Sequence, residues 1–160
     1  SSRLLGRDQL TNNVTQSQIV SYLQRILQCQ DPTAGATIVI GMQSGKGTAN
    51  VLVSMRGALL SSWRTAYIHM IVLGSSINPA VDPKTTLDSS EEWAPEMGSY
   101  MNKGNPYNVN FKKAYYDDSC NRLFEIKKKY DPTNSLFVLT GVGSNAWDYN
   151  LNTGKLCQMA

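Results

Sequence analysis

Histidine is nearly absent from this sequence: His69 is the only one among 160 residues. A Ser-His-Asp hydrolase would have to use it as the base, and the chain has no Gly-x-Ser-x-Gly elbow for a nucleophile. One histidine without a neighbouring carboxylate or cysteine pattern also argues against a metal site, so we expect no metal. Two interpretations of His69 remain open: a packed or hydrogen-bonded strand residue, or a residue that faces a substrate cavity.

Cysteine is also scarce, and Cys29, Cys120 and Cys157 do not have the spacing of a zinc or redox motif. An odd number in a secreted chain indicates a free thiol or a partner cysteine elsewhere. The sequence has one N-glycosylation motif, Asn13-Val14-Thr15. The motif makes Asn13 a candidate glycosylation site and favours an extracellular location, although a motif this short also arises by chance.

Long apolar runs and a large net charge are missing too. No stretch reaches the ~18–20 apolar residues that a membrane helix needs, so we expect no membrane span. The net charge of +3 is too small to indicate nucleic-acid binding. Hydrophobic residues make up 41% of the chain, which is typical of a globular protein with a core. The first residues contain neither an initiator Met nor a signal-peptide pattern, from which we expect a processed chain or a portion of a longer polypeptide.

The glycine-rich tract 41–48 is superficially like a phosphate-binding loop. That motif needs four residues between its glycines and a Ser or Thr directly after the Lys. Here three residues separate Gly41 from Gly45, and Gly47 follows Lys46. We therefore expect a hairpin turn.

The apolar pattern of the first half predicts one helix and several strands. Thr15 and Gln18 form a capping-box pattern ahead of a helical spacing of apolar residues, which predicts a helix over 15–29. Short β-branched segments predict a strand over 36–42, a second over 50–55 that pairs back with it, and a long third over 63–73. One face of the third strand would carry Tyr67 and His69.

The second half predicts a different mixture of elements. Residues 74–98 form a long connection, followed by a short strand over 98–102. Asn108 or Asn110 caps a short helix through about residue 116. A second helix covers about 119–129, with Leu123 and Ile126 inward, and ends in a turn over 130–134. The fold class is α+β, with an antiparallel sheet backed by helices.

Four segments, taken in order, carry a family resemblance. They are 50–72, with Ser62-Trp63-Arg64; 93–106, with Ser99-Tyr100-Met101-Asn102; 111–123; and 126–157, with Lys129-Tyr130-Asp131-Pro132-Thr133-Asn134 as the most specific part. Together they resemble the C-terminal part of fungal berberine-bridge-enzyme-like oxidases of the vanillyl-alcohol-oxidase superfamily. The isoamyl-alcohol-oxidase-like branch is the most similar, and the resemblance covers nearly the whole chain.

This resemblance implies an architecture and partners. Residues 1–98 would be the later part of a substrate-binding domain, and residues 99–160 a return segment that completes an FAD-binding domain. The partners would be an N-terminal FAD-binding polypeptide of the same enzyme, a small-molecule substrate and O2, in a secreted protein. Alone, such a chain would expose the faces that pack on the flavin domain, so we expect it to aggregate or oligomerise.

The resemblance also implies a chemistry. Such enzymes oxidise an alcohol-type or amine-type carbon by hydride transfer to FAD, and O2 is reduced to H2O2. Tyr100 would be the catalytic residue, and Asn102, Asn134 and Gly141 would contact the cofactor. Tyr67 and His69 would bind substrate.

One position departs from the family pattern. Many relatives carry a second Tyr directly after the Asn, where it serves as the base, but this chain has Lys103. Tyr67 and His69 are then secondary candidates for the base. If the opposite face of their strand looks inward, the candidates become Arg64, Ile68 and Met70. A second function class, a non-catalytic binding or structural module, also remains open.

Overall fold

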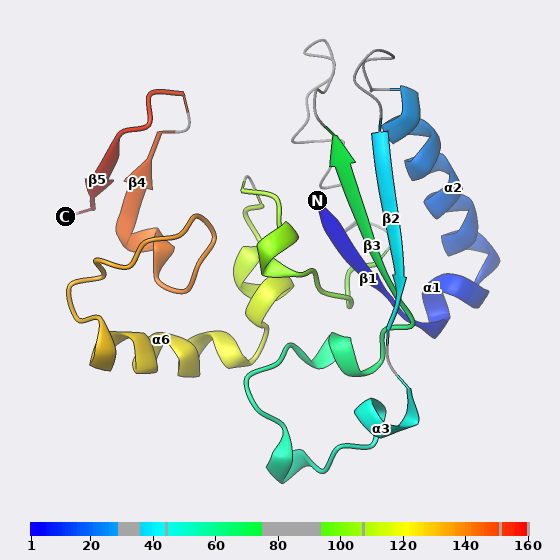
Figure 1. The fold of residues 1–160 in the computed structure, drawn as a ribbon, viewed down its shortest axis with the longest axis horizontal. Coiled ribbons are helices and arrows are strands. Elements are labelled where there is room, and N and C mark those ends of the chain that lie inside the picture. The colour runs from blue at the N-terminus through cyan, green and yellow to red at the C-terminus, as the bar shows by residue number, and fades with distance from the viewer. Residues whose placement is uncertain (29–35, 44, 75–93, 107, 151, 160) are drawn as a thin grey trace.

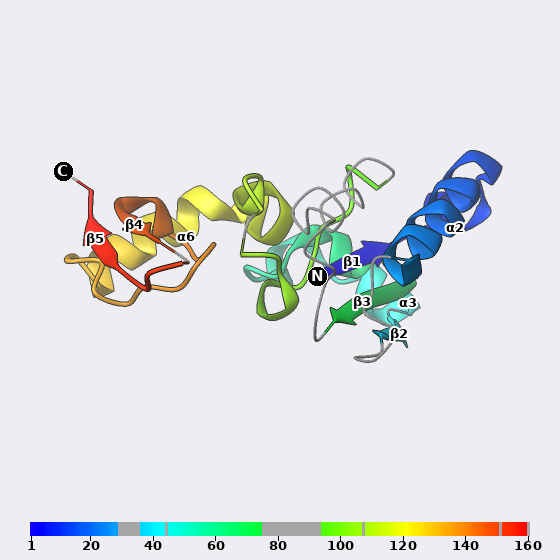
Figure 2. The same cartoon turned by 90° about the horizontal axis from the view of Figure 1, so that it is seen from above.

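The computed structural model describes residues 1–28, 36–43, 45–74, 94–106, 108–150 and 152–159. The fold is α+β, as the sequence predicts. One half holds a three-stranded antiparallel sheet beside two helices. The other half holds one long helix and a two-stranded ribbon. The two halves lie at opposite ends of the molecule in both views (Figures 1 and 2).

The sheet has the order β1-β3-β2, formed by Ser2–Leu5, Ile68–Gly74 and Ala36–Met42. Its register places His69 between Leu4 of β1 and Gly41 of β2. The predicted strand over 36–42 is confirmed. The predicted strand over 63–73 is confirmed only from Ile68 onward, because its first part is the 3-10 helix η2, Ser61–Arg64.

The predicted hairpin between 36–42 and 50–55 is wrong. The chain after β2 forms the short helix α3, Lys46–Ala49, and then the 3-10 turn η1, Val53–Met55. β2 pairs along its whole length with β3 instead. The apolar side chains of 52–55 are largely exposed, so burial does not favour their pairing as a strand in this chain.

The outer edge of β1 is covered by residues 98–100, which the sequence analysis predicted as part of a strand. The Leu4 amide donates to Gly98 O (2.9 Å), and the Ser99 hydroxyl donates to Ser2 O (2.6 Å). The Tyr100 amide donates to the Ser2 hydroxyl (3.1 Å). The strand prediction is wrong because the Ser2 and Ser99 hydroxyls take the place of backbone-to-backbone hydrogen bonds. The 3-10 turn η3, Met101–Lys103, follows directly.

Two helices pack beside the sheet. α1 covers Arg7–Thr11 and α2 covers Asn13–Gln28, which confirms the predicted helix with an earlier start. The predicted cap at Thr15 is wrong: the Asn12 side chain accepts from the amides of Val14 (2.9 Å) and Thr15 (3.3 Å). Tyr22 of α2 is 1% exposed and lies in one core cluster with β1, β3 and the segments around Leu60 and Met97. Its buried members are Leu4, Leu5, Tyr22, Leu60, Ala66, Met70, Val72, Ala94 and Met97.

The C-terminal half begins with the π-helix η4, Lys112–Tyr116, and α6, Ser119–Tyr130, so both predicted helices are present. Leu123 is half-buried, but the prediction that Ile126 points inward is wrong, since it is 41% exposed. The 3-10 turn η5, Ser144–Ala146, leads into a ribbon that the sequence analysis did not predict. Its strands are β4, Trp147–Tyr149, and β5, Leu156–Gln158. Within the described ranges, no helix has both the length and the apolar character to cross a bilayer.

Candidate functional site

Three aromatic rings from separate parts of the chain meet on one face of the sheet. His69 of β3 lies 5.0 Å from Trp63 of η2 and 5.9 Å from Tyr100, measured between ring centroids. Trp63 and Tyr100 are 5.8 Å apart. All three pairs are edge-to-face, the arrangement that aromatic quadrupoles favour. We call these residues the aromatic triad.

Tyr100 is the most exposed member of the triad and the one that carries a hydroxyl. Its side chain is 38% exposed. The Asn102 amide donates to its hydroxyl oxygen at 2.7 Å, and the Ser2 contacts fix its backbone. Since the Asn102 contact uses a lone pair, the Tyr100 O–H remains available to donate to a ligand. The sequence analysis predicted this Tyr-x-Asn pair, and the structure joins the two side chains directly.

His69 is the buried member, with 6% of its surface exposed. Burial lowers its pKa, because desolvation disfavours the imidazolium. Its Nε2 atom has no hydrogen-bond partner among the described residues. Unpartnered buried nitrogens are costly and uncommon, so this atom is a strong marker of a functional or positioning role.

The structure also separates the two faces of β3. Met70 is buried in the hydrophobic core and Ile68 packs against it, whereas His69 on the opposite face meets Tyr100. Arg64 is half-buried at the end of η2. Tyr67, two residues before His69, is 45% exposed. Of the candidates from the sequence, His69 is the one whose ring meets Tyr100.

The candidates Asn134 and Gly141 lie in the C-terminal half, in the turns that follow α6. Asn134 has a positive φ of 52°, and its carbonyl accepts from the Trp147 indole N–H (2.8 Å). Its buried Oδ1 has no partner among the described residues. A Cβ at Gly141 would lie 2.9 Å from Val138 O, so this glycine permits a close turn.

Tyr116 links the segment around Tyr100 to the turn that holds Gly141, although the sequence analysis did not single it out. Its hydroxyl lies 2.7 Å from Met101 Sδ, between Tyr100 and Asn102, and 3.3 Å from Thr140 O, next to Gly141. Burial, with Cys120 nearby, raises the Tyr116 pKa, which keeps the phenol protonated. A sequence signal for this link is hard to find, because it joins residues that are 15 and 24 positions apart.

Asp131, within the most specific part of the family resemblance, organises the turn after α6. It is 7% exposed, and its carboxylate accepts from the Lys127 ammonium (2.6 Å) and the Leu136 amide (3.1 Å). The Ser135 amide (2.8 Å) and hydroxyl (2.9 Å) complete its shell. These contacts, led by Lys127, hold the Asp131 pKa at about 2. Asp131 is therefore a structural anion, which places Asn134 three residues further on.

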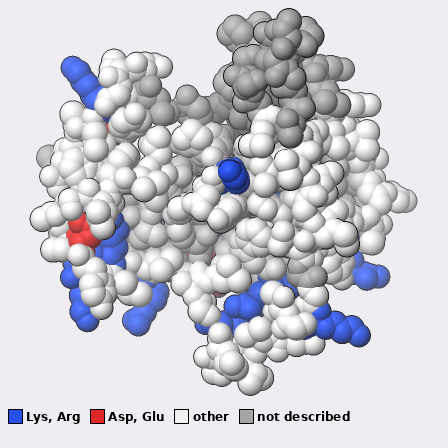
Figure 3. Space-filling model, in the orientation of Figure 1, with Lys and Arg blue, Asp and Glu red and all other residues white. Residues whose placement is uncertain are grey.

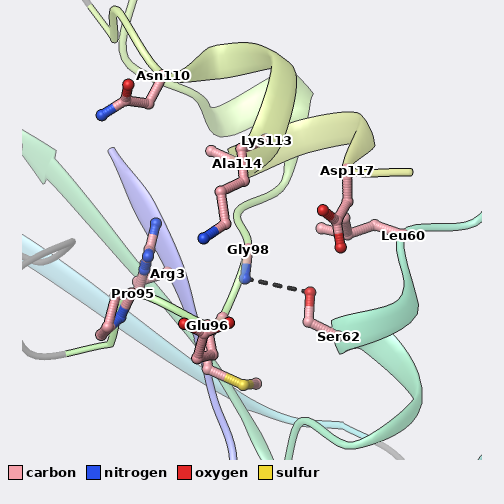
Figure 4. Close-up of a pocket in the computed structure, with 11 residues that line it drawn as sticks. Arg3, Leu60, Ser62, Pro95, Glu96, Gly98, Asn110, Lys113, Ala114 and Asp117 are labelled. Atoms are coloured by element: carbon pink, nitrogen blue, oxygen red, sulfur yellow. Dashed lines mark hydrogen bonds between the residues drawn. The ribbon is translucent and has the colours of Figure 1, made fainter. Parts of the chain in front are cut away.

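A separate cavity of about 470 Å³ lies between β1, the 95–98 segment and η4 (Figure 4). Arg3 and Lys113 extend into it from β1 and η4, and Asp117 lines it with a positive φ of 46°. The Gly98 amide donates to the Ser62 hydroxyl (3.1 Å) along one wall. Arg3 is 2% exposed and donates to Ala94 O. None of the residues predicted from the sequence as site residues lines this cavity.

The remaining sequence predictions concern modification and metals. Asn13 is exposed as the first residue of α2. Cys120 is half-buried and Cys157 exposed, both as free thiols, and Cys29 lies outside the described residues. In the part of the chain that the structure describes, no three His, Cys, Asp or Glu residues gather as metal ligands would.

Comparisons with known proteins match this arrangement to one group. The family described as "Berberine and berberine like" matches residues 99–139, the stretch from Tyr100 through Asn134. The FAD-linked oxidoreductase patO of Penicillium expansum is 28% identical over 98% of this chain and 27% of its own length. The VAO-type flavoprotein oxidase VAO615 of Thermothelomyces thermophilus is 43% identical over 46% of this chain and 13% of its own length.

Two solved structures share the fold. The VAO-type flavoprotein MtVAO615 from Myceliophthora thermophila C1 has a TM-score of 0.70 and 25% identity, over 99% of this chain and 29% of that one. MtVAO713 from the same source has a TM-score of 0.72 at 22% identity, over 99% and 28%. The chain thus spans less than a third of the length of each of these relatives.

Proposed function

We propose that this chain, which is homologous to the C-terminal portion of VAO-type FAD-linked oxidoreductases, is one part of a secreted oxidase. In this proposal residues 1–98 belong to the substrate-binding domain, and residues 99–160 complete an FAD-binding domain. The rest of the FAD site comes from an N-terminal polypeptide of the same enzyme. The assembled enzyme oxidises an alcohol-type or amine-type small molecule, as in the isoamyl-alcohol-oxidase-like branch, and Asn13 carries a glycan.

The observation that carries this proposal is the aromatic triad with Asn102. It places an exposed phenol, an amide and a buried imidazole together where the family match begins. Such a group of polar tips on apolar rings is typical of a small-molecule site. The position of Tyr116 between Met101 and Thr140 adds a direct route from this site to the turn that holds Gly141.

The available polar atoms fit the edge of a flavin ring, which presents hydrogen-bond donors and acceptors in a plane. The Tyr100 O–H is free to donate, and the buried Asn134 Oδ1 and His69 Nε2 have no described partners. When bound, FAD supplies the hydride acceptor. In the proposal Asn102, Asn134 and Gly141 contact the cofactor, while Tyr67 and His69 line the substrate pocket.

In this proposal Tyr100 orients the substrate through its hydroxyl and is the catalytic residue of the chain. Asn102 holds that hydroxyl in place at 2.7 Å. Lys103, which stands where many relatives carry the basic Tyr, is exposed in η3. His69 stays neutral near pH 7 because burial lowers its pKa, so it is the secondary candidate for accepting the substrate proton.

The test is flavin content followed by one substitution. The natural polypeptide that contains this chain should show flavin absorbance near about 450 nm and bleach when substrate is added anaerobically. Tyr100→Phe should retain the absorbance but slow the bleaching by roughly 10²-fold, the scale on which a substrate misplaced by about 1 Å loses rate. Tyr130→Phe, on the exposed surface of α6, is the matched control and should bleach at the normal rate. A colourless protein would refute the oxidase proposal.

A non-catalytic module is the second candidate, and the location of the core favours it. Nine buried apolar residues form one cluster between Leu4 and Met97, so the N-terminal half has a core of its own. A stable monomer of 17.7 kDa without flavin, measured by light scattering, would support this candidate. Aggregation of the isolated chain would favour the oxidase part.

A further inference from the structure

Three cations from separate elements line one open groove of about 730 Å³. Arg7 begins α1, Lys46 begins α3, and Arg64 ends η2. Figure 3 shows blue side chains gathered on the lower part of the molecule, where α3 and the start of α1 lie in the same orientation. We call this feature the cationic groove. Tyr67, one of the proposed substrate residues, also lines the cationic groove.

The charges of the cationic groove are not neutralised within the described part of the chain. None of its three cations has a carboxylate within 4.0 Å there. Asp8 and Glu96 also line the groove, but both are exposed and neither forms an ion pair with them. Cations held near one another repel, and a partner with negative charge would remove that repulsion.

Exposed apolar side chains lie in the same segment of the chain, between Lys46 and Arg64. Leu52, Val53 and Met55 are 66%, 75% and 72% exposed, and Leu59 is 50% exposed. Arg56 adds a further cation, which donates through Nε to Val51 O (3.1 Å). The sequence contains no Asp or Glu between Asp31 and Asp82. Residues 45–64 therefore combine exposed apolar side chains with positive charge and contain no acidic residue.

The occupant of this surface must offer both negative charge and apolar side chains. A free anion would neutralise the groove but leave the apolar residues in water, which monomeric proteins rarely tolerate over a large patch. The relatives that match along nearly the whole chain are each more than three times as long as the region they share with it. A folded partner of that size can cover both parts of the surface.

We infer that residues 45–64 and Arg7 dock against an acidic surface of the FAD-binding polypeptide. This inference rests on the proposed function, because it names a contact of the partner proposed there. Carboxylates of the partner enter the cationic groove, while its apolar side chains cover Leu52, Val53 and Met55. The contact holds the Tyr67 side of the sheet against the partner and so aligns the aromatic triad with the flavin.

Zero-length cross-linking tests this contact directly. A carbodiimide joins an amine to a carboxylate only where the two touch, and Lys46 is the one amine of the groove. Treatment of the intact flavoprotein should give a peptide that joins Lys46 to an Asp or Glu outside these 160 residues. A Lys46 that remains unlinked, or links only to Asp8 or Glu96, would overturn the inference. So would a link from Lys46 to another copy of this chain.

Charge reversal gives an independent test with a matched control. Arg7→Glu with Lys46→Glu should preserve folding, since both side chains are exposed and acidic residues suit a helix start. We expect roughly tenfold weaker association with the FAD-binding polypeptide at low salt, and a shallower salt dependence. Arg7→Lys with Lys46→Arg keeps both positive charges in the groove and should leave association unchanged. Equal association of the two double variants would contradict the inference.

The two proposals fail in different ways. If the material carries no flavin while Lys46 still links to an acidic partner, the oxidase function fails and the docking surface stands. If flavin is present and Lys46 does not link outside the chain, the docking surface alone fails. A phosphate titration is the last test. Inorganic phosphate is added to the intact flavoprotein in 10-fold steps, and the NMR signals of the arginine side chains of the cationic groove are followed. Saturable phosphate binding by the intact flavoprotein would show an open groove and overturn the docking.

Discussion

The two halves of this molecule are held together by different interactions. In the N-terminal half, nine apolar residues between Leu4 and Met97 are buried in one cluster. In the C-terminal half, α6 has no buried residue, and among the described residues after 110 only Ala114 and Tyr115 are buried apolar ones. Polar contacts replace the core there, and four of them meet at the Asp131 carboxylate.

The residues that match the family model are not the residues that form the hydrophobic core. The matched residues 99–139 lie almost entirely in the half with little core, so local packing contributes little to holding them in place. A segment of this kind gains stability when it is covered by another surface. The exposed Ile126, Leu136 and Val138 are consistent with such a cover, as the oxidase proposal requires.

The largest expected effect is a cavity in the N-terminal core. Leu4 is fully buried, so Leu4→Ala should lower the free energy of unfolding by about 2–5 kcal/mol. Urea unfolding followed by far-ultraviolet circular dichroism measures this change. Leu59→Ala, at a half-exposed position, should cost much less and serves as the control. Equal losses in the two variants would mean that the cluster around Leu4 is not the stabilising centre.

The next effect concerns the polar centre of the other half. Asp131→Asn removes the anion that Lys127 and three donors share, so the turn over 131–136 should open while the sheet remains folded. The NMR signal of the Trp147 indole N–H, which donates to Asn134 O, reports this opening. Glu125→Gln breaks only an exposed ion pair with Lys128 and should leave the signal in place.

Acid should produce the same opening in the unchanged chain. The Asp131 pKa is lowered to about 2 in the folded state, so its contribution is present above the ordinary Asp value of about 3.9. It is lost as the pH falls from that value through 2. An indole signal that disappears already near pH 6 would assign the opening to another group.

The smallest effect is a pH dependence of the N-terminal half. Burial lowers the His69 pKa, so the unfolded chain takes up a proton near pH 6.5 before the folded chain does. Stability should therefore fall below about pH 6.5, with a slope of at most about 1.4 kcal/mol per pH unit. His69→Phe should remove the slope between pH 5 and 7, because the chain has no other histidine. An unchanged slope in this variant would contradict the assignment.

Local periodicity was sufficient for the longer elements. The sequence correctly predicted α2, β2 and α6, because each carries its own spacing of apolar residues or its own boundary signals. It failed at 50–55 and 98–102. In the first, β-branched residues lie in short turns, and in the second, the strand-like contacts depend on the Ser2 side chain about a hundred positions away.

The candidates for the site came from the family resemblance and from alternation along the chain. The structure adds two contacts that the sequence analysis did not predict: the Asn102 amide donates to the Tyr100 hydroxyl, and the His69 ring of β3 meets the Tyr100 ring. Trp63 in the triad, the bridging Tyr116 and the cationic groove depend on tertiary neighbours. No spacing in the sequence predicts these three features, since the residues that form each of them come from separate elements.

The hydrogen bonds between β1 and residues 98–100 also determine when the two edges of β1 can be covered during synthesis. β1 leaves the ribosome before its neighbour β3, which follows about seventy residues later, and its other edge is filled only when Tyr100 has emerged. Contacts so distant in sequence close slowly, and an unpaired strand edge is open to wrong pairing while it waits. The aromatic triad can therefore form only after Tyr100 has emerged, and a ribosome stalled before residue 98 would carry a chain with its sheet open on that side.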